Sequence, residues 1–151
     1  MAATHDSRTH TIDDVVTIAL QRFARDDGEL VVADSTSDVG FPIQRVFTVT
    51  APLGAERGKH AHLTCSQFML CTHGAIDIVC DDGERQKTIP LDRGDVGLLV
   101  PPTIWSTVIY REQNSVLTVL CDRAYEADDY IREYEAFRSY RVAAQQLLLS
   151  S

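Results

Sequence analysis

The sequence of 151 residues lacks any apolar run near the roughly 20 residues that a membrane-spanning helix requires. The segment from Met1 to His10 is polar and mixed, with neither an apolar stretch nor an arginine-rich amphipathic pattern, and predicts no export signal. No internal repeat, low-complexity tract or linker interrupts the chain, so one domain is expected. A hydrophobic share of 44% and a charged share of 24% are ordinary for a soluble globular protein.

Positive charge is scarce, because 14 Lys and Arg stand against 22 Asp and Glu and give a net charge of -8. This balance disfavours nucleic acid and anionic membrane surfaces as partners. An anionic small molecule stays compatible with it, because binding depends on the local field. Arg45, Arg57 and Lys59 lie close in sequence to two histidines, although they equally fit a solvated surface.

Cysteine is present, but the C-x-x-C pairs of zinc knuckles are absent. The four cysteines lie singly in apolar, strand-like segments, which is typical of buried thiols in a cytoplasmic protein. They are Cys65, Cys71, Cys80 and Cys121.

Short segments rich in β-branched and aromatic residues fill most of the chain, with turn residues about every 8–12 positions. This pattern predicts an all-β sandwich or small barrel. Asp26-Asp27-Gly28 predicts a hairpin turn into a strand at 29–33, whereas 15–23 fits neither the helical nor the strand period. Further strands are predicted at 41–50, 68–71, 75–80, 86–91, 96–100, 105–110 and 115–121.

The tail changes to a helical period. Tyr130, Ile131, Tyr134 and Phe137 recur at helical spacing, and acidic residues stand where the first turn would be. We therefore predict a C-terminal α-helix over about 127–148. The whole reading is a flexible N-terminus at 1–12 followed by a single domain at 13–151.

Two histidines, His60 and His62, stand between a small charged turn and an apolar strand. In an extended segment residues i and i+2 point to the same face, so both imidazoles are expected to aim at one place. Such a pair fits half of a metal site, a proton-transfer pair, or two solvated side chains at a strand edge.

The spacing His60-x-His62, Gln67, Gly74 resembles the first motif of the cupin superfamily, and Gly94, Pro101-Pro102 and Trp105 resemble its second. The resemblance implies a double-stranded β-helix, or jelly-roll, barrel. Metal-binding cupins use two His, a Glu and a second-motif His as ligands. Here Gln67 holds the Glu position and Ser106 replaces the last His, and both are poor ligands for a transition metal. We expect no metal and no other cofactor.

A narrower resemblance covers residues 28 to 138. Phe41-Pro-Ile-Gln-Arg-Val, Arg57-Gly-Lys-His-Ala-His with Gln67, and Asp128-Asp129-Tyr130-Ile131-Arg132-Glu133-Tyr134 look like the WxcM-like cupins. That family comprises nucleotide-sugar 3,4-ketoisomerases, which act on dTDP-4-keto-6-deoxyglucose without a cofactor. The likeness implies a dTDP-linked 4-keto-6-deoxy sugar as partner. It also implies a homodimer, often with exchanged N-terminal strands.

The resemblance places the catalytic centre on His60 and His62. A C–H beside a ketone is weakly acidic, and a neutral imidazole can remove the C3 proton and allow a proton to return at C4. Arg57 and Arg132 fall in family motifs as nucleotide or pyrophosphate contacts. The full set expected to bind substrate is Arg45, Thr48, Arg57, Lys59, Gln67 and Arg132.

Two positions depart from the family pattern: Thr48 lies in a pair that usually includes tyrosine, and Ser106 follows Trp105 where histidine is usual. Two other functions therefore stay open. One is a non-catalytic cupin that binds nucleotide sugars, and the other is a metal-dependent cupin enzyme. Turnover of a dTDP-4-keto sugar distinguishes the first alternative, and metal analysis of the purified protein distinguishes the second.

Overall fold

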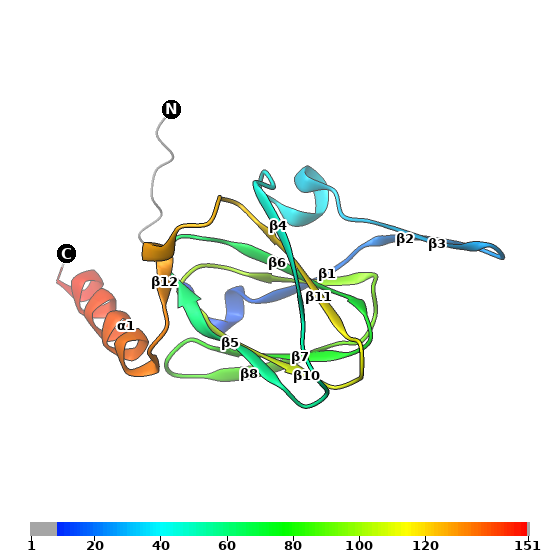
Figure 1. The fold of residues 1–151 in the computed structure, drawn as a ribbon. Coiled ribbons are helices and arrows are strands. Elements are labelled where there is room, and N and C mark those ends of the chain that lie inside the picture. The colour runs from blue at the N-terminus through cyan, green and yellow to red at the C-terminus, as the bar shows by residue number, and fades with distance from the viewer. Residues whose placement is uncertain (1–8, 151) are drawn as a thin grey trace.

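The computed structural model describes residues 9–150, which form a β-barrel with a projecting N-terminal hairpin and one C-terminal helix (Figure 1). The strands are β1 (Val16–Ala19), β2 (Gln21–Arg25), β3 (Gly28–Val32), β4 (Arg45–Thr50), β5 (Glu56–His62), β6 (Gln67–His73), β7 (Ile76–Asp81), β8 (Gln86–Leu91), β9 (Val96–Val100), β10 (Trp105–Tyr110), β11 (Val116–Cys121) and β12 (Tyr130–Ile131). The helix α1 spans Tyr134–Leu149, and short helical turns span Ile12–Asp14, Ser35–Val39 and Ala127–Asp129.

Two five-stranded sheets face each other across the barrel (Figure 1). One has the order β1-β9-β6-β11-β4 and the other β12-β5-β10-β7-β8, with every neighbouring pair antiparallel. Apart from β7 and β8, the neighbours are not consecutive in sequence, as in a jelly roll. The predicted all-β cupin barrel is confirmed.

The core fills the space between the sheets, because inward-facing residues alternate with outward-facing ones along the strands. On β10 the alternation buries Val108 and Tyr110. The Tyr110 hydroxyl is inside the barrel, and it donates a hydrogen bond to the Val49 carbonyl at 2.9 Å. A second apolar cluster around Phe68 lies on the outer face of β6 and is covered by N-terminal segments.

The N-terminal region is more ordered than the sequence suggests. Of the predicted flexible segment, residues 1–8 lie outside the described residues, whereas Ile12 is buried and its N–H donates to Asp82 at 2.8 Å. The segment of unclear period contains β1, which pairs with β9, and most of β2. The predicted turn at Asp26 to Gly28 closes the hairpin of β2 and β3.

The predicted C-terminal helix begins too early. A 3₁₀ turn at Ala127–Asp129 and strand β12 precede α1, which starts at Tyr134. β12 pairs with the end of β5, Tyr130 opposite His62 and Ile131 opposite Ala61. Pairing with an otherwise open strand edge outweighs the helical spacing here, and it brings this segment to the histidines.

Among residues 9–150, α1 is neither long nor apolar enough to cross a bilayer, and the other helices are single turns.

Candidate active site

The two histidines lie together at the end of β5, as the sequence predicts. Their ring centroids are 5.1 Å apart, with the rings nearly perpendicular. His60 is half-buried and lines a cavity of about 190 Å³ in the barrel mouth. His62 is 5% exposed and lies behind it, outside the cavity lining. The pair therefore presents one ring to a ligand and keeps the other inside the protein.

A β-bulge at Gly58 and Lys59 decides which basic side chain faces the cavity. The register between β10 and β5 shifts there, with Ser106 opposite His60 but Thr107 opposite Gly58. The extra residue reverses the usual alternation, so Arg57, three positions before His60, lines the same cavity. Gly58 has φ +80, and a Cβ there would stand 3.1 Å from the Ser106 carbonyl oxygen, which favours glycine.

The cavity lining is partly apolar and partly polar. Its apolar lining comes from β4, β6, β10 and β11: Phe47, Val49, Met69, Val108, Leu117 and Val119. Its polar lining combines His60 with Arg57, Arg132, Gln67 and Ser106. Such a chamber, with two guanidinium groups beside one imidazole, suits a ligand that has an anionic part and a less polar part.

Both imidazoles are held neutral near pH 7. Burial lowers the pKa of His60, opposed by a hydrogen bond that the ring donates to the Gly58 backbone and assisted by the positive charge of Arg132. Burial and then the neighbouring His60 lower the pKa of His62 to about 4, although Asp129 opposes the change. A neutral imidazole has a free lone pair, so the exposed ring can accept a proton.

Asp129 fixes the orientation of His62. One carboxylate oxygen lies 3.2 Å from His62 Nδ1 and also accepts from the Cys65 N–H at 3.1 Å. The other accepts from the Thr64 N–H at 2.8 Å and from the Thr64 hydroxyl. Because an ionised carboxylate only accepts, Nδ1 carries the proton and Nε2 of His62 holds the lone pair.

Tyr130 covers both histidines from the paired strand β12. Its ring centroid lies 5.0 Å from that of His60 and 4.3 Å from that of His62, and the Arg132 guanidinium stacks on it at 4.3 Å. Arg45 approaches the Tyr130 hydroxyl at 3.5 Å. Tyr130 therefore links the histidine pair to an arginine on each side.

A buried thiol pair lies beneath this layer. The Cys65 thiol donates to the Ser66 carbonyl at 3.5 Å. Its interaction with Cys121 raises the pKa of Cys65 and lowers that of Cys121 to about 6. Arg45 lies 3.6 Å from the Cys121 sulfur and Gln67 Nε2 lies 3.9 Å from it. All four cysteines are buried and free of disulfide bonds.

The structure brings five of the predicted site residues to the cavity wall or just behind it: His60, His62, Arg57, Gln67 and Arg132. The other three lie outside the cavity lining, and their role in substrate binding stays a prediction. Thr48 is exposed on the outer face of β4, because the strand turns Phe47 inward instead. Lys59 is exposed by the bulge and pairs with Glu56 at 3.3 Å. Arg45 lies outside the lining and contacts Tyr130 and Cys121.

Asp129 and Tyr130 are functional candidates that the sequence reading assigned to a helix. The available signal was their place in the same D-D-Y-I-R motif that singled out Arg132. Because Asp129 and Tyr130 stand beside Arg132, which was expected to bind the ligand, the motif fits a ligand-binding site better than the start of a helix.

The residues at the usual cupin ligand positions, Gln67 and Ser106, are both buried against the cavity, and neither offers an imidazole or carboxylate. A different group does come together: His62, Cys65 and Asp129 have ligand atoms within 4.8 Å of one another. This group lies behind the cavity wall and differs from the metal site of the cupin motif.

A jelly-roll barrel with a histidine pair and arginines at its mouth defines the chain as a cupin whose chamber suits an anionic ligand. Residues 13–142 match the family model described as "FdtA: WxcM-like, C-terminal". The chain belongs to this family.

Named relatives agree with one another in activity. The TDP-4-oxo-6-deoxy-alpha-D-glucose-3,4-oxoisomerase of Aneurinibacillus thermoaerophilus is 35% identical over 75% of this chain and 82% of its own. The crystal structure of QdtA, a sugar 3,4-ketoisomerase from Thermoanaerobacterium thermosaccharolyticum in complex with TDP, superposes with a TM-score of 0.84. It has 27% identity and covers 88% of this chain and 98% of its own. The TDP-quinovose 3,4-ketoisomerase WlaRB of Campylobacter jejuni has a TM-score of 0.78, 30% identity, and coverage of 85% and 99%.

Proposed function

We propose that this protein is a sugar 3,4-ketoisomerase. It converts dTDP-4-keto-6-deoxyglucose to a dTDP-3-keto-6-deoxyhexose for deoxyamino-sugar biosynthesis in the cytoplasm. The observation that carries the proposal is a neutral imidazole, His60, in the wall of a cavity that two arginines share. The activity of the named relatives supports it.

In this mechanism His60 is the base. It removes the proton from C3, beside the C4 ketone, and leaves an enediolate whose charge is on O4, and the proton of the C3 hydroxyl then passes to O4. A proton is then delivered to C4, and the carbonyl ends at C3. His60 is assigned because its ring lines the cavity, whereas His62 does not. General acid–base catalysis of this kind contributes about 10²–10⁴-fold.

His62 acts behind His60. Asp129 holds its Nδ1–H, so its Nε2 lone pair stays available as a second proton carrier. Its ring edge also packs against His60 and limits the orientations that the base can take. The two histidines thus have separate roles: His60 contacts the sugar, and His62 orients His60 from behind.

The arginines hold the anionic part of the substrate. Arg57 and Arg132 both line the cavity and are exposed towards solvent, where a diphosphate can reach them. A guanidinium binds phosphate oxygens with paired hydrogen bonds, and two of them provide multi-point contact despite the acidic net charge. Ser106 and Gln67 are the neutral polar groups left to contact the sugar.

The direct test incubates the purified protein with dTDP-4-keto-6-deoxyglucose in excess chelator and follows the product by NMR. We expect a 3-keto sugar, and in D₂O we expect deuterium at C4 unless the same imidazole returns its proton before it exchanges. Binding without turnover would make the protein a nucleotide-sugar-binding cupin. Activity that is lost with chelator and restored by one divalent ion would make it a metal-dependent enzyme.

Replacement of Arg132 by alanine should raise KM more than it lowers kcat. Arg132 contacts the diphosphate in the ground state and the transition state alike, so its loss weakens both together. Steady-state kinetics measure the split. Arg138→Ala on the exposed part of α1 is the control, since Arg138 lies outside the cavity lining. An unchanged KM in Arg132→Ala would show that Arg132 does not bind the substrate and only stacks on Tyr130.

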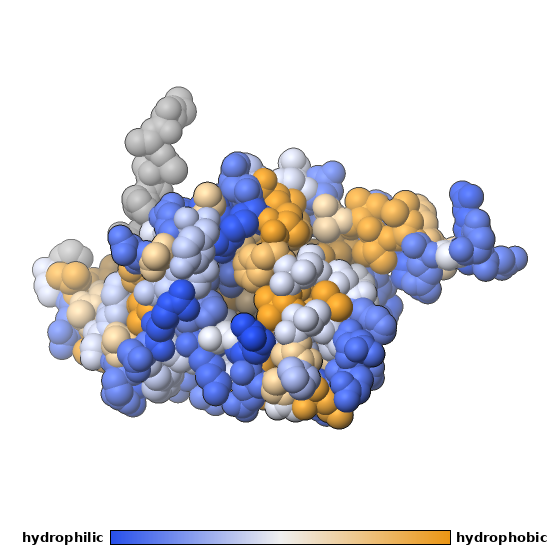
Figure 2. Space-filling model, viewed as in Figure 1, coloured by the Kyte–Doolittle hydropathy of each residue, from blue (hydrophilic) through white to orange (hydrophobic). Residues whose placement is uncertain are grey.

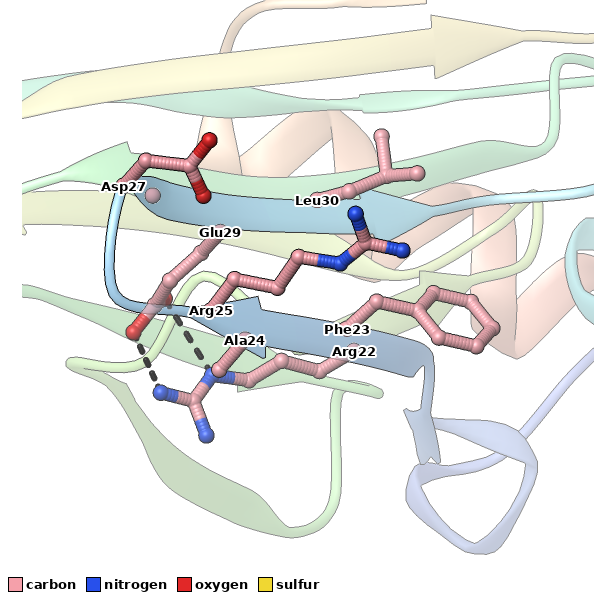
Figure 3. Close-up of a pocket in the computed structure, with 8 residues that line it drawn as sticks. Arg22, Phe23, Ala24, Arg25, Asp27, Glu29 and Leu30 are labelled. Carbon is pink, nitrogen blue, oxygen red and sulfur yellow. Dashed lines mark hydrogen bonds and ion pairs between the residues drawn. The ribbon is translucent and has the colours of Figure 1, made fainter.

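We also propose that the protein is a homodimer whose N-terminal hairpin contacts the partner. The hairpin of β2 and β3 extends from the barrel, and apolar surface gathers near its base (Figures 1 and 2). Phe23 and Leu30 are 53% and 59% exposed, while Arg22 and Glu29 pair across the strands (Figure 3). A two-stranded ribbon is marginal alone, so a second chain is the natural cover for it.

Phe23→Glu with Leu30→Glu should convert the dimer to monomers, because each carboxylate would be buried in the interface. Sedimentation velocity at micromolar concentration measures the mass. Leu53→Glu, at a comparably exposed leucine outside the hairpin, should leave the dimer intact. A wild-type chain that sediments as a monomer would refute the proposal.

A further inference from the structure

Three side chains of metal-ligand type meet behind the cavity wall. His62, Cys65 and Asp129 are all buried, and one ligand atom from each lies within 4.8 Å of the others. They come from different elements: His62 ends β5, Cys65 follows it in a loop, and Asp129 ends the turn before β12. The pairing of β12 with β5 brings them together.

The donor set matches one class of ion. An imidazole, a thiolate and a carboxylate are the ligands that zinc takes in proteins, whereas magnesium and calcium select oxygen ligands alone. Zinc bonds of 2.0–2.3 Å place neighbouring ligand atoms roughly 3.3–3.8 Å apart in a tetrahedron. Nδ1 of His62 and the Asp129 oxygen already stand 3.2 Å apart, close to this spacing, and the Cys65 sulfur lies within 4.8 Å of both.

The local hydrogen bonds allow this exchange. Nδ1 must give up its proton to become a ligand, and the proton then moves to Nε2. Within residues 9–150, His62 Nε2 has no hydrogen-bond partner, so the change of tautomer breaks only the bond to Asp129. The Thr64 N–H and hydroxyl remain on the other Asp129 oxygen and orient the carboxylate, as outer contacts do in zinc sites.

Charge also balances at this place. Zinc displaces the Cys65 thiol proton to solvent, so one thiolate and one carboxylate neutralise the dication in a buried position. Arg123 donates to the Thr64 hydroxyl at 2.7 Å, and Arg45 lies beyond Cys121, so both guanidinium groups are one residue removed from the ligands.

We propose that His62, Cys65 and Asp129 form an inhibitory zinc site, distinct from the cupin metal position at Gln67 and Ser106. Zinc bound to Nδ1 leaves His62 without a free lone pair and coordinates the Asp129 carboxylate. His62 can then no longer act as the second proton carrier behind His60. That zinc binds these three residues does not depend on what the protein catalyses. That zinc inhibits the protein rests on the proposed isomerase activity.

The experiment uses the full chain, first with Co²⁺ as a spectroscopic probe and then with Zn²⁺. A thiolate ligand gives Co²⁺ a sulfur-to-metal charge-transfer band, and a four-coordinate site gives strong visible bands. We expect one metal ion per chain by equilibrium dialysis with both features. Saturating Zn²⁺ should lower turnover by at least about tenfold, and excess EDTA should restore it.

Cys65→Ala should abolish the charge-transfer band and weaken Zn²⁺ binding by more than about tenfold. Cys80→Ala, at a buried cysteine of β7 outside the group, is the matched control and should change neither. Should Cys65→Ala fail to fold, Cys65→Ser gives the same readout, because a hydroxyl produces no such band.

Two results would overturn the site: no charge-transfer band in the wild-type protein, or an unchanged band and affinity in the Cys65 variants. If the band is present but the dTDP-keto sugar is not turned over, the zinc site stands and the proposed isomerase function fails.

Discussion

His60→Asn should lower kcat by about 100-fold or more, equivalent to about 2.7 kcal/mol of transition-state stabilisation, and should leave KM nearly unchanged. Asparagine is close to histidine in size and keeps one hydrogen bond, but it cannot act as a base near neutral pH. Because the diphosphate contacts of Arg57 and Arg132 remain, nucleotide binding should persist. Exchange of the C3 proton of the substrate into D₂O should disappear in the same variant.

The pH dependence of kcat/KM provides a second test of His60 as the base. The base must be unprotonated, and burial lowers the His60 pKa. Below its folded pKa the ring is protonated and kcat/KM falls, so the acid limb should lie below about 6.5, the ordinary value for histidine. His60→Asn should remove that limb from the residual activity.

His73→Asn is the matched control, because His73 is exposed at the far end of β6. It should keep wild-type kcat. Near-normal turnover in His60→Asn, with the loss confined to His62→Asn, would transfer the role of base to His62. Near-normal turnover in both variants would favour the non-catalytic binding module.

The barrel can be predicted from the sequence because the signals that mark its strands are local. Strand alternation and regular turns mark most strands within a residue or two, and the i, i+2 rule places His60 and His62 on one face. The same rule misplaces the basic residues, because it assumes an unbroken strand. In an unbroken strand Arg57 and Lys59 would share the face opposite His60, whereas the inserted residue turns Arg57 alone to the cavity. No propensity in Arg57-Gly-Lys59 reports that insertion.

The long-range part of the site is harder to predict. Asp129 and Tyr130 match a helix start because helical spacing continues through them. Tyr130 instead pairs with His62 of β5, and Asp129 contacts the same histidine from 67 residues away. That pairing depends on the open edge of β5, which appears only when the barrel is closed. The family motif identifies Arg132, but it gives no reason why the carboxylate three residues earlier, Asp129, should meet His62.

Asp129→Asn should lower both turnover and stability. The carboxylate accepts four hydrogen bonds, two on each oxygen, from Thr64, Cys65 and His62. Asparagine has one acceptor oxygen, so its NH₂ group must face either the two Thr64 donors or the Cys65 N–H and His62. At least one buried N–H then loses its acceptor, at about 1–3 kcal/mol of unfolding free energy. Chemical denaturation measures this loss.

The catalytic effect follows from the tautomer of His62. The amide oxygen keeps the two Thr64 bonds, of which the N–H bond at 2.8 Å is shorter than the bonds to Cys65 and His62, so the NH₂ group faces Nδ1. It then favours the form of His62 with the proton on Nε2, which removes the lone pair that Asp129 leaves free. We expect kcat to fall by about 10- to 100-fold with KM nearly constant, since Asp129 does not line the cavity. Asp128→Asn is the control, because Asp128 is adjacent but exposed. A variant that loses stability and keeps wild-type kcat and pH profile would show that Asp129 only holds the loop.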